Sequence, residues 1–300
     1  MNGFKDVIVN SPIRWAGSKR KILNEMLNTF SKNKKNYIEM FLGSGVVLLN
    51  VLDNNNVLKY KNFYVNDINS NIINFYVLLR DNLDYVLIQM KEFENKYNSY
   101  SIDGKEEYYY KIRYDFNNMD SCNEKALLFY FLMKTGFNGV YRENKNGKFN
   151  VPFGRKEKVV INEEYLHKVS DSIQNVKFYN LECKDFLKEM KKNKKLDDAF
   201  VYCDPPYLPD DALVSQKQEL YTSDSFNHKS FFEKLVELKQ KPNIMISMAD
   251  SKIANIIYNN KPFKRIDMRE IVRTINPKKL FSSKEVAFIN YELENVEKND

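Results

Sequence analysis

An apolar run followed by an acidic, proline-rich loop occurs at Ala199-Phe200-Val201-Tyr202-Cys203-Asp204-Pro205-Pro206-Tyr207 and indicates the fold class. It opens with apolar residues rich in β-branched and aromatic side chains, which predicts a short buried strand. The two prolines cannot extend a sheet ladder and each fixes its own φ, so the loop after the strand is rigid. Ligands of open α/β sheets bind just beyond the carboxyl ends of the strands. The sequence therefore predicts a binding loop that begins with a carboxylate.

The groups on this loop suit a planar base that carries an exocyclic amino group. Asp204 and the carbonyl of Pro205 would accept hydrogen bonds from the two N–H groups, and Tyr207 would stack on the ring. A strand that ends in an ordinary Asp-Pro turn is the alternative explanation. The whole loop, directly after an apolar strand, favours a binding site.

Strands alternate with helices along most of the chain. We expect further strands at 37–41, 63–65, 176–179, 244–246, near 263 and at 286–289, and helices at 22–30, from 46, at 72–79, 231–238 and 253–258. Ser18 is the expected N-cap of the first helix. The alternation predicts an α/β fold with a parallel or mixed doubly wound sheet.

The segment from about 81 to 164 breaks this alternation. It contains two helical stretches, one dense in tyrosine between 108 and 116 and one at 126–134. Asn146-Gly147 then lies between two strand-like runs, which is a strong hairpin signal. Six basic residues decorate this region: Arg142, Lys145, Lys148, Arg155, Lys156 and Lys158. A solvated basic loop would explain the charge alone, but a helical insertion that ends in a basic hairpin favours contact with DNA.

Two glycines mark the turn after the first predicted strand, in Glu39-Met40-Phe41-Leu42-Gly43-Ser44-Gly45. A tight strand-to-helix turn would explain them, but Asp67 ends the next strand, where dinucleotide-binding folds grip a ribose diol. The third glycine of a pyrophosphate-binding loop is missing. A nucleoside without a pyrophosphate, such as S-adenosylmethionine, therefore fits better than NAD.

The segment from Ser11 to Lys19 holds the only tryptophan, Trp15, beside Arg14. Trp15 could be core filler. Together with Lys19 it could also hold a sulfonium through cation–π contact and a carboxylate through an ion pair.

Composition excludes several classes. The 47 Lys and Arg against 40 Asp and Glu give a net charge of +7, which is compatible with nucleic acid but weak as an indication, because AT-biased coding also enriches lysine. The three scattered cysteines and two histidines predict neither a disulfide framework nor a metal site. No long apolar run or leader-like segment is present, so we expect a cytoplasmic protein without a membrane span.

These motifs resemble those of the Dam-like (α-group) DNA adenine N6-methyltransferases over nearly the whole chain, and they occur in the same order. The matching segments are Arg14–Lys19, Glu39–Gly45, Asn66–Asn69, Gly136–Arg142, Phe149–Gly154, Asp204–Tyr207, Tyr221-Thr222 with Phe226, and Arg273–Asn276 before Lys284-Glu285-Val286. Ser18 replaces a usual glycine, and Met40 replaces a usual proline.

The resemblance implies a Rossmann-like doubly wound methyltransferase sheet with an inserted, mainly helical DNA-recognition domain that ends in a β-hairpin. Residues 1–80 and 165–300 would form the catalytic domain that binds S-adenosylmethionine, and residues 81–164 would recognise the target. The reaction would be methyl transfer to the exocyclic amino group of adenine in duplex DNA, with base flipping.

The resemblance also implies roles for individual residues. The catalytic residues would be Asp204, Pro205 and Tyr207. The cofactor-binding residues would be Trp15, Lys19, Glu39, Gly43, Gly45, Asp67, Asp185, Phe186 and Asp204. The DNA-binding residues would be Arg14, Phe137, Asn138, Arg142, Lys148, Arg155 and Lys156, with Arg142 at a guanine edge and Phe137-Asn138 as a wedge.

Partners and specificity follow less directly. Double-stranded DNA is the expected partner, GATC or a related short site the expected target, and a monomer or weak dimer the expected state. A cognate restriction endonuclease would be a separate chain. One alternative is an amino-group methyltransferase for RNA or protein, whose similar loop usually begins with Asn; another is a catalytically silent DNA-binding module, which the intact Asp204, Tyr207, Asp67 and Gly43 disfavour.

Overall fold

The computed structural model of the chain describes residues 4–5, 8–15, 19–208, 222–223, 226–239, 241–276 and 279–293. The predicted N-cap Ser18 and the motif residue Tyr221 lie outside the described residues.

A seven-stranded sheet forms the centre of the molecule, in the order β3-β2-β1-β4-β7-β9-β8. Its strands are β1 (Asn36–Glu39), β2 (Asn62–Asn66), β3 (Val176–Tyr179), β4 (Ala199–Cys203), β7 (Asn243–Ala249), β8 (Lys264–Asn276) and β9 (Lys279–Ile289). The first five strands in this order are parallel, and β9 runs antiparallel to both β7 and β8. The predicted mixed, doubly wound sheet is thus confirmed. A separate short pair is formed by β5 (Thr222–Ser223) and β6 (Phe226–Asn227).

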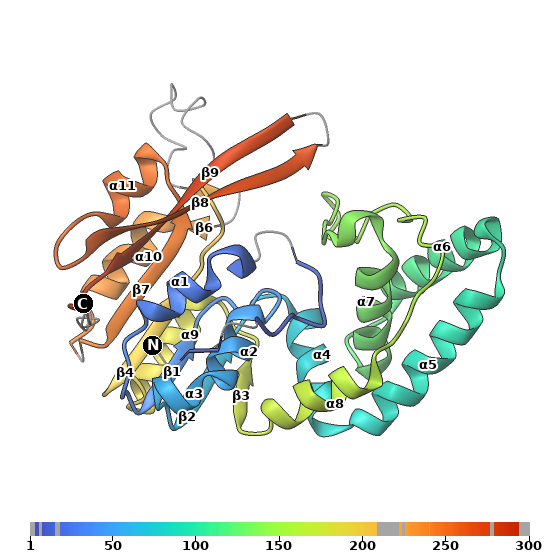
Figure 1. Ribbon diagram of the computed structural model, residues 1–300, viewed down its shortest axis with the longest axis horizontal. Coiled ribbons are helices and arrows are strands. Elements are labelled where there is room, and N and C mark those ends of the chain that lie inside the picture. The colour runs from blue at the N-terminus through green and yellow to red at the C-terminus, as the bar shows by residue number, and fades with distance from the viewer. Residues whose placement is uncertain are drawn as a thin grey trace.

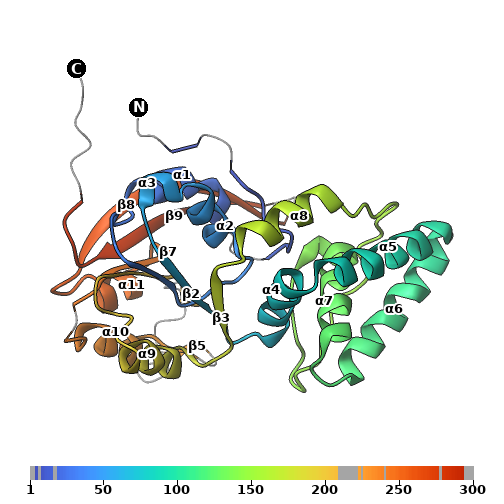
Figure 2. The ribbon, with the colours of Figure 1, turned by 90° about the horizontal axis from the view of Figure 1, so that it is seen from below.

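Helices cover both faces of the sheet (Figure 2). One face packs against α1 (Leu23–Asn28), α2 (Val46–Asp53), α3 (Asn55–Leu58), α4 (Ser70–Asp81) and α8 (Glu163–Ser172), with a 3-10 turn at Lys19–Lys21 before α1. The other face packs against α9 (Cys183–Lys192), α10 (His228–Val236) and α11 (Lys252–Tyr258). Successive strand residues point to opposite faces: Tyr37 belongs to the first core and Ile38 to the second. Both faces of the sheet are therefore buried, which explains the apolar runs of the central strands.

The inserted segment is a helical body beside the sheet (Figures 1 and 2). It contains α5 (Leu83–Ser99), α6 (Ile102–Asn118) and α7 (Asn123–Thr135), followed by a 3-10 turn at Phe137–Gly139. The prediction of two helical stretches was wrong, because α5 is a third. This helix buries only a narrow stripe, with Val86, Met90 and Tyr97 in the core, and polar or charged residues interrupt its apolar pattern.

The predicted hairpin is present only as an irregular fold-back. The chain turns at Asn144–Lys148, and its arms meet at isolated antiparallel bridges, Glu143 with Phe149 and Gly136 with Phe153. Around the first bridge the two backbone bonds run from Asn150 to Arg142 and from Asn144 to Lys148, while the side chain of Asn117 on α6 binds the outward-facing backbone groups of Phe149: its amide donates to the carbonyl and accepts from the N–H.

The last two strands are much longer than predicted. Strands were expected only near 263 and at 286–289, whereas β8 and β9 form an antiparallel ribbon that projects beyond the other strands in Figure 1. Charged residues interrupt the apolar pattern of both strands, and this hid their length.

Candidate active site

A cavity of about 590 Å³ opens at the carboxyl ends of β1 and β4. These two strands are neighbours. From β1 the sheet continues to β2 in one direction, and from β4 it continues to β7 in the opposite direction, so the order of the strands reverses between β1 and β4. Such a reversal is where open α/β sheets bind ligands. The cavity is lined by several predicted site residues: Trp15, Lys19, Glu39, Gly43, Asp67, Asp204, Pro205 and Tyr207.

Lys19 lies at the polar centre of the site. Its side chain is only 2% exposed, and its ammonium group lies 2.6 Å from a carboxylate oxygen of Asp204. It also donates to the hydroxyl of Tyr207 at 2.5 Å. Burial alone would lower the pKa of Lys19, but the nearby Asp204, Tyr207 and Glu285 outweigh it, so the pKa is raised and the lysine stays charged. The loop residues Asp204 and Tyr207 are thereby tied to a segment that lies 185 residues earlier in the chain.

Two further carboxylates face the cavity from neighbouring strands. Asp67 accepts hydrogen bonds of 2.8 Å from the backbone N–H groups of Gly43 and Asn69. Glu39 is buried and accepts a hydrogen bond from Tyr37 at 2.7 Å. Burial raises the pKa of Glu39 well above its ordinary value, and the nearby Asp204 and Asp67 raise it further. The site therefore carries an excess of negative potential that a bound cation would relieve.

The glycine turn shapes one wall of the cavity. Gly45 has φ of +77° and caps α2. A Cβ at this position would lie 2.4 Å from the hydroxyl of Tyr76, which donates to the carbonyl of Ser44. Gly45 therefore packs against Tyr76 and is not among the lining residues, whereas Gly43 and Ser44 line the cavity. The structure does not bring the predicted cofactor ligand Gly45 to the cavity.

Asp185 and Phe186, predicted to contact the cofactor, are also not among the lining residues. Phe186 is fully buried under the sheet against Tyr179. Asp185 is exposed on α9 and forms an ion pair with Lys188 at 2.8 Å. Neither side chain faces the cavity, because the first turn of α9 directs one into the core and the other toward solvent.

Trp15 connects the cavity with the inserted segment. It lines the cavity beside Gly43 and stacks on Tyr141, with ring centres 5.3 Å apart. Arg14, the preceding residue, is exposed and packs on Gly139, whose φ is +60° and which has no room for a Cβ beside the arginine.

The predicted DNA-binding residues lie on the inserted segment and beside it. Phe137 is 52% exposed although it is a large apolar residue, and Asn138 next to it has φ of +53°. Arg142 is exposed and donates to the side-chain oxygen of Asn150 at 2.8 Å. Lys148 and Arg155 are exposed as well.

A basic cluster forms where three segments meet. Burial lowers the pKa of Lys134, and the charges of Arg14 and Lys156 lower it further. Burial and Arg14 likewise lower the pKa of Lys156. Arg14 and Lys156 were predicted to bind DNA, whereas no role was predicted for Lys134, at the end of α7. The three cations repel one another and would gain from a bound anion.

The chain is similar to known DNA methyltransferases. Residues 15–274 match the family profile of the D12 class N6 adenine-specific DNA methyltransferases. The Type II methyltransferase M.MjaIII of Methanocaldococcus jannaschii is 32% identical over 281 residues, which cover 89% of this chain and 92% of that protein. The chain belongs to the D12 class N6 adenine-specific DNA methyltransferase family.

Two named DNA adenine methylases are similar over a comparable length. That of Haemophilus influenzae is 29% identical over 287 residues and 92% of each chain. That of Escherichia coli K12 is 28% identical over 264 residues, or 87% of this chain and 88% of the relative. Membership of the D12 class confirms the predicted enzyme class and decides against an RNA or protein methyltransferase.

Sequence reasoning missed one group in the site of this D12 class methyltransferase. Glu285 on β9 is 0% exposed, and its carboxylate accepts a hydrogen bond from Tyr207. The only signal in the sequence was its place in Lys284-Glu285-Val286, which suggested no role.

Among the described residues, no group of three or more His, Cys, Asp or Glu side chains could hold a metal ion. In that same part of the chain, no helix is long and apolar enough to cross a membrane.

Proposed function

We propose that the cavity binds S-adenosylmethionine and that the chain transfers its methyl group to the exocyclic amino group of adenine in duplex DNA. The proposal rests on one observation: Asp67 and the loop residues Asp204 and Tyr207, which lie far from Asp67 in the sequence, line one cavity where the order of the strands reverses.

The residues of the cavity fit this cofactor. A volume of about 590 Å³ lies within the range of small-molecule sites. Asp67 has lone pairs beyond its two backbone bonds and could accept from a ribose diol. Asp204 would supply negative charge for a molecule that carries a sulfonium and an ammonium group, and these cations would favour the ionised form of Glu39, whose pKa is raised by burial. Trp15 offers an aromatic face beside them. The bound cofactor would supply an electrophilic methyl group.

The chain's own contribution to catalysis would be positioning. An aromatic amino group is a weak nucleophile because its lone pair is delocalised into the ring. Asp204 and the Pro205 carbonyl would accept hydrogen bonds from its two N–H groups. The Tyr207 ring would stack on the base and hold the amino nitrogen in line with the methyl group of the cofactor. The negative charge of Asp204 would also stabilise the positive charge that develops on the nitrogen.

Residues 81–164 would form the target-recognition domain within a catalytic domain of residues 1–80 and 165–300. The exposed Phe137 and Asn138 support a role as a wedge beside the flipped base. The cluster of Arg14, Lys134 and Lys156 would bind backbone phosphates, and Arg142 would read a guanine edge. GATC is the recognition sequence that we propose, and a cognate restriction endonuclease would be a separate chain.

The substrate class and the cofactor site can be tested together. Wild-type protein should incorporate tritiated methyl groups from S-adenosylmethionine into duplex DNA, and not into RNA or protein. Asp67→Ala should weaken cofactor binding in calorimetry by at least tenfold, whereas the exposed Asp171→Ala on α8 should not change it. Incorporation into RNA or protein only, or equal cofactor affinity of the two variants, would contradict the proposal.

A further inference from the structure

Glu285 is the buried acid of the site to which the proposed mechanism gives no role. It lies on β9, and its carboxylate oxygens lie 3.0 and 3.1 Å from the hydroxyl of Tyr207. Burial and the nearby Asp204 raise the pKa of Tyr207 to about 12, so the hydroxyl stays protonated and donates a hydrogen bond to Glu285. The Tyr207 hydroxyl is therefore held between two partners, Lys19 as donor and Glu285 as acceptor.

Lys19 links the two carboxylates of the site. Its ammonium group lies 2.6 Å from Asp204 and 3.7 Å from Glu285. It also lies 4.6 Å from the centre of the Tyr207 ring. A single buried cation thus faces two acids, one on the loop after the central strand β4 and one on β9.

An irregularity in the sheet lies directly opposite Glu285. The register pairs Asp267 with Val286 and Glu270 with Lys284, so two residues of β8 oppose Glu285 alone. Such bulges re-aim side chains and are frequent next to active sites. Across the other edge, Glu285 pairs with Ala249 at the end of β7.

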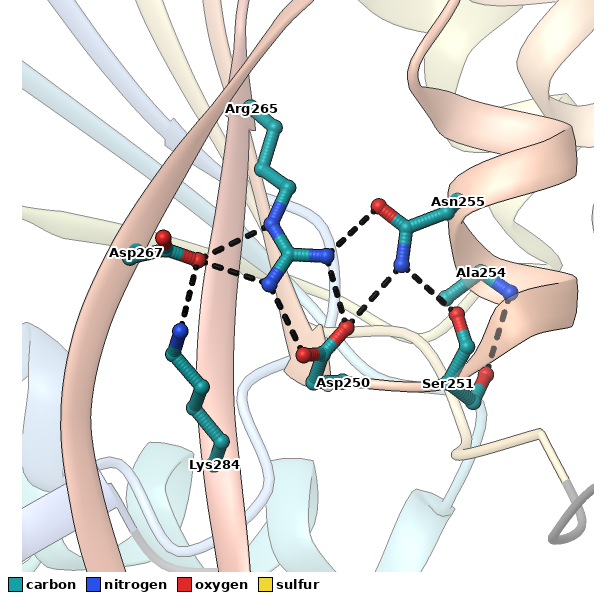
Figure 3. Close-up of polar contacts among 7 residues, drawn as sticks. All are labelled: Asp250, Ser251, Ala254, Asn255, Arg265, Asp267 and Lys284. Atoms are coloured by element: carbon teal, nitrogen blue, oxygen red, sulfur yellow. Dashed lines mark hydrogen bonds and ion pairs between the residues drawn. The ribbon is translucent and has the colours of Figure 1, made fainter.

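A polar network fixes the backbone at this point (Figure 3). Arg265 on β8 binds both oxygens of Asp250 at 2.8 Å and also donates to Asp267. Lys284 completes the network with an ion pair of 3.2 Å to Asp267, and its carbonyl accepts from the N–H of Asp250. The residue next to Glu285 is thereby tied to both neighbouring strands, which fixes where the Glu285 side chain enters the site.

We propose that Glu285 is a positioning residue for methyl transfer: it holds the Tyr207 ring through its hydroxyl and, with Asp204, holds Lys19 between the two acids. The proposal rests on the proposed function, in which Tyr207 stacks on the target adenine. Glu285 acts through Tyr207 and Lys19, so its loss should slow the transfer step and leave DNA binding unchanged.

The test combines single-turnover kinetics with a double-mutant cycle. Glu285→Ala should lower the single-turnover rate of methyl transfer by roughly 100-fold, the scale expected for a misplacement of about 1 Å. Glu285→Gln keeps an acceptor for the Tyr207 hydroxyl and should therefore recover part of that loss. If the alanine variant does not fold, the rate of the glutamine variant tests the proposal. In a Tyr207→Phe background, the same Glu285 substitutions should cost clearly less, because the hydroxyl that they act on is gone.

Glu94 provides a matched control. It is a buried acid of α5 that accepts a hydrogen bond from the backbone N–H of Ile161 and does not line the cavity. Glu94→Gln should leave the transfer rate of the folded enzyme unchanged. Wild-type rates for both Glu285 variants, or losses that multiply fully with that of Tyr207→Phe, would overturn the inference. Absence of methyl transfer by the wild type would instead overturn the proposed function.

Discussion

Lys19 shows how one residue organises the chemistry of the site. A lysine that is 2% exposed would lose its charge without partners, and here the nearby acids keep it protonated. It pairs with Asp204 and donates a hydrogen bond to Tyr207, and so fixes the arrangement of the Asp204 loop. This preorganisation is what a mechanism based on positioning requires.

A buried histidine makes stability depend on pH. His228 is 0% exposed; its Nδ1 lies 2.7 Å from the hydroxyl of Tyr258, and its Nε2 has no partner among the described residues. Burial lowers the pKa of His228 from 6.5 to about 4, so below pH 6.5 the unfolded chain binds a proton that the folded chain excludes. Stability is therefore complete above about pH 6.5 and falls by up to about 3 kcal/mol as the pH drops toward 4.

Chemical denaturation at a series of pH values tests this account of His228. His228→Gln should flatten the dependence of the unfolding free energy between pH 4 and 6.5. His167→Gln, at an exposed histidine on α8, should leave it as in the wild type. Equal slopes in all three proteins would show that His228 does not control acid stability.

At the scale of the element, the turn between β1 and α2 depends on glycine. Gly45→Ala would place a methyl group 2.4 Å from the Tyr76 hydroxyl at a φ of +77°. Gly147→Ala meets the same kind of backbone strain at φ of +69° but has no atom within 4 Å. We expect Gly147→Ala to cost about 1 kcal/mol of unfolding free energy and Gly45→Ala clearly more, with weaker cofactor binding. Equal losses in denaturant unfolding would mean that the contact with Tyr76 is unimportant.

The irregular fold-back after α7 should decide sequence recognition. Arg142 is anchored by Asn150 and exposed, so Arg142→Ala should cost about 1–3 kcal/mol and relax the preference at one base pair. Lys148→Ala should weaken binding to all duplexes alike and reduce the salt dependence. Kinetics on the cognate duplex and on singly substituted duplexes separate the two effects. If Arg142→Ala lowered the activity equally on all duplexes, Arg142 would be only a phosphate contact.

Much of the fold could be predicted from the sequence because its central strands are buried on both faces. Phe63-Tyr64-Val65 and Ala199–Cys203 are continuous apolar runs, and the structure has strands at both. The ribbon of β8 and β9 escaped prediction because its pairing depends on backbone hydrogen bonds between strands rich in charge. Helix α5 escaped because it buries only a narrow stripe.

The site was predictable where a residue directly follows a strand, as Asp67 and Asp204 do. It was not predictable where a residue depends on distant pairing. Glu285 enters the site only because β9 lies antiparallel to β7 and a bulge in β8 faces it. Lys134 joins Arg14 only because the end of α7 meets the N-terminal segment. Asp185 and Phe186 were assigned by resemblance, and nothing in their own pattern could reveal which way their side chains point.

In the molecule as a whole, the sheet and the helical insertion would both contribute to the proposed reaction. The cavity lies where the order of the strands in the sheet reverses. The helical insertion lies beside the sheet (Figure 1). Trp15 stacks on Tyr141 of the insertion while it lines the cavity, so the proposed cofactor site and DNA surface share one aromatic contact. This continuity suits an enzyme that must pass a base from a duplex into a pocket.

Methyl transfer to adenine by the Asp204 loop can be measured directly in cells. The wild type and Asp204→Ala are expressed in a methylation-deficient host, and modified bases are mapped by single-molecule sequencing. We expect N6-methyladenine at one short site, GATC by our proposal, with the wild type and none with Asp204→Ala, although the variant should still fold and shift DNA in a gel. Methylation of cytosine alone, or methyladenine at wild-type levels with Asp204→Ala, would contradict it.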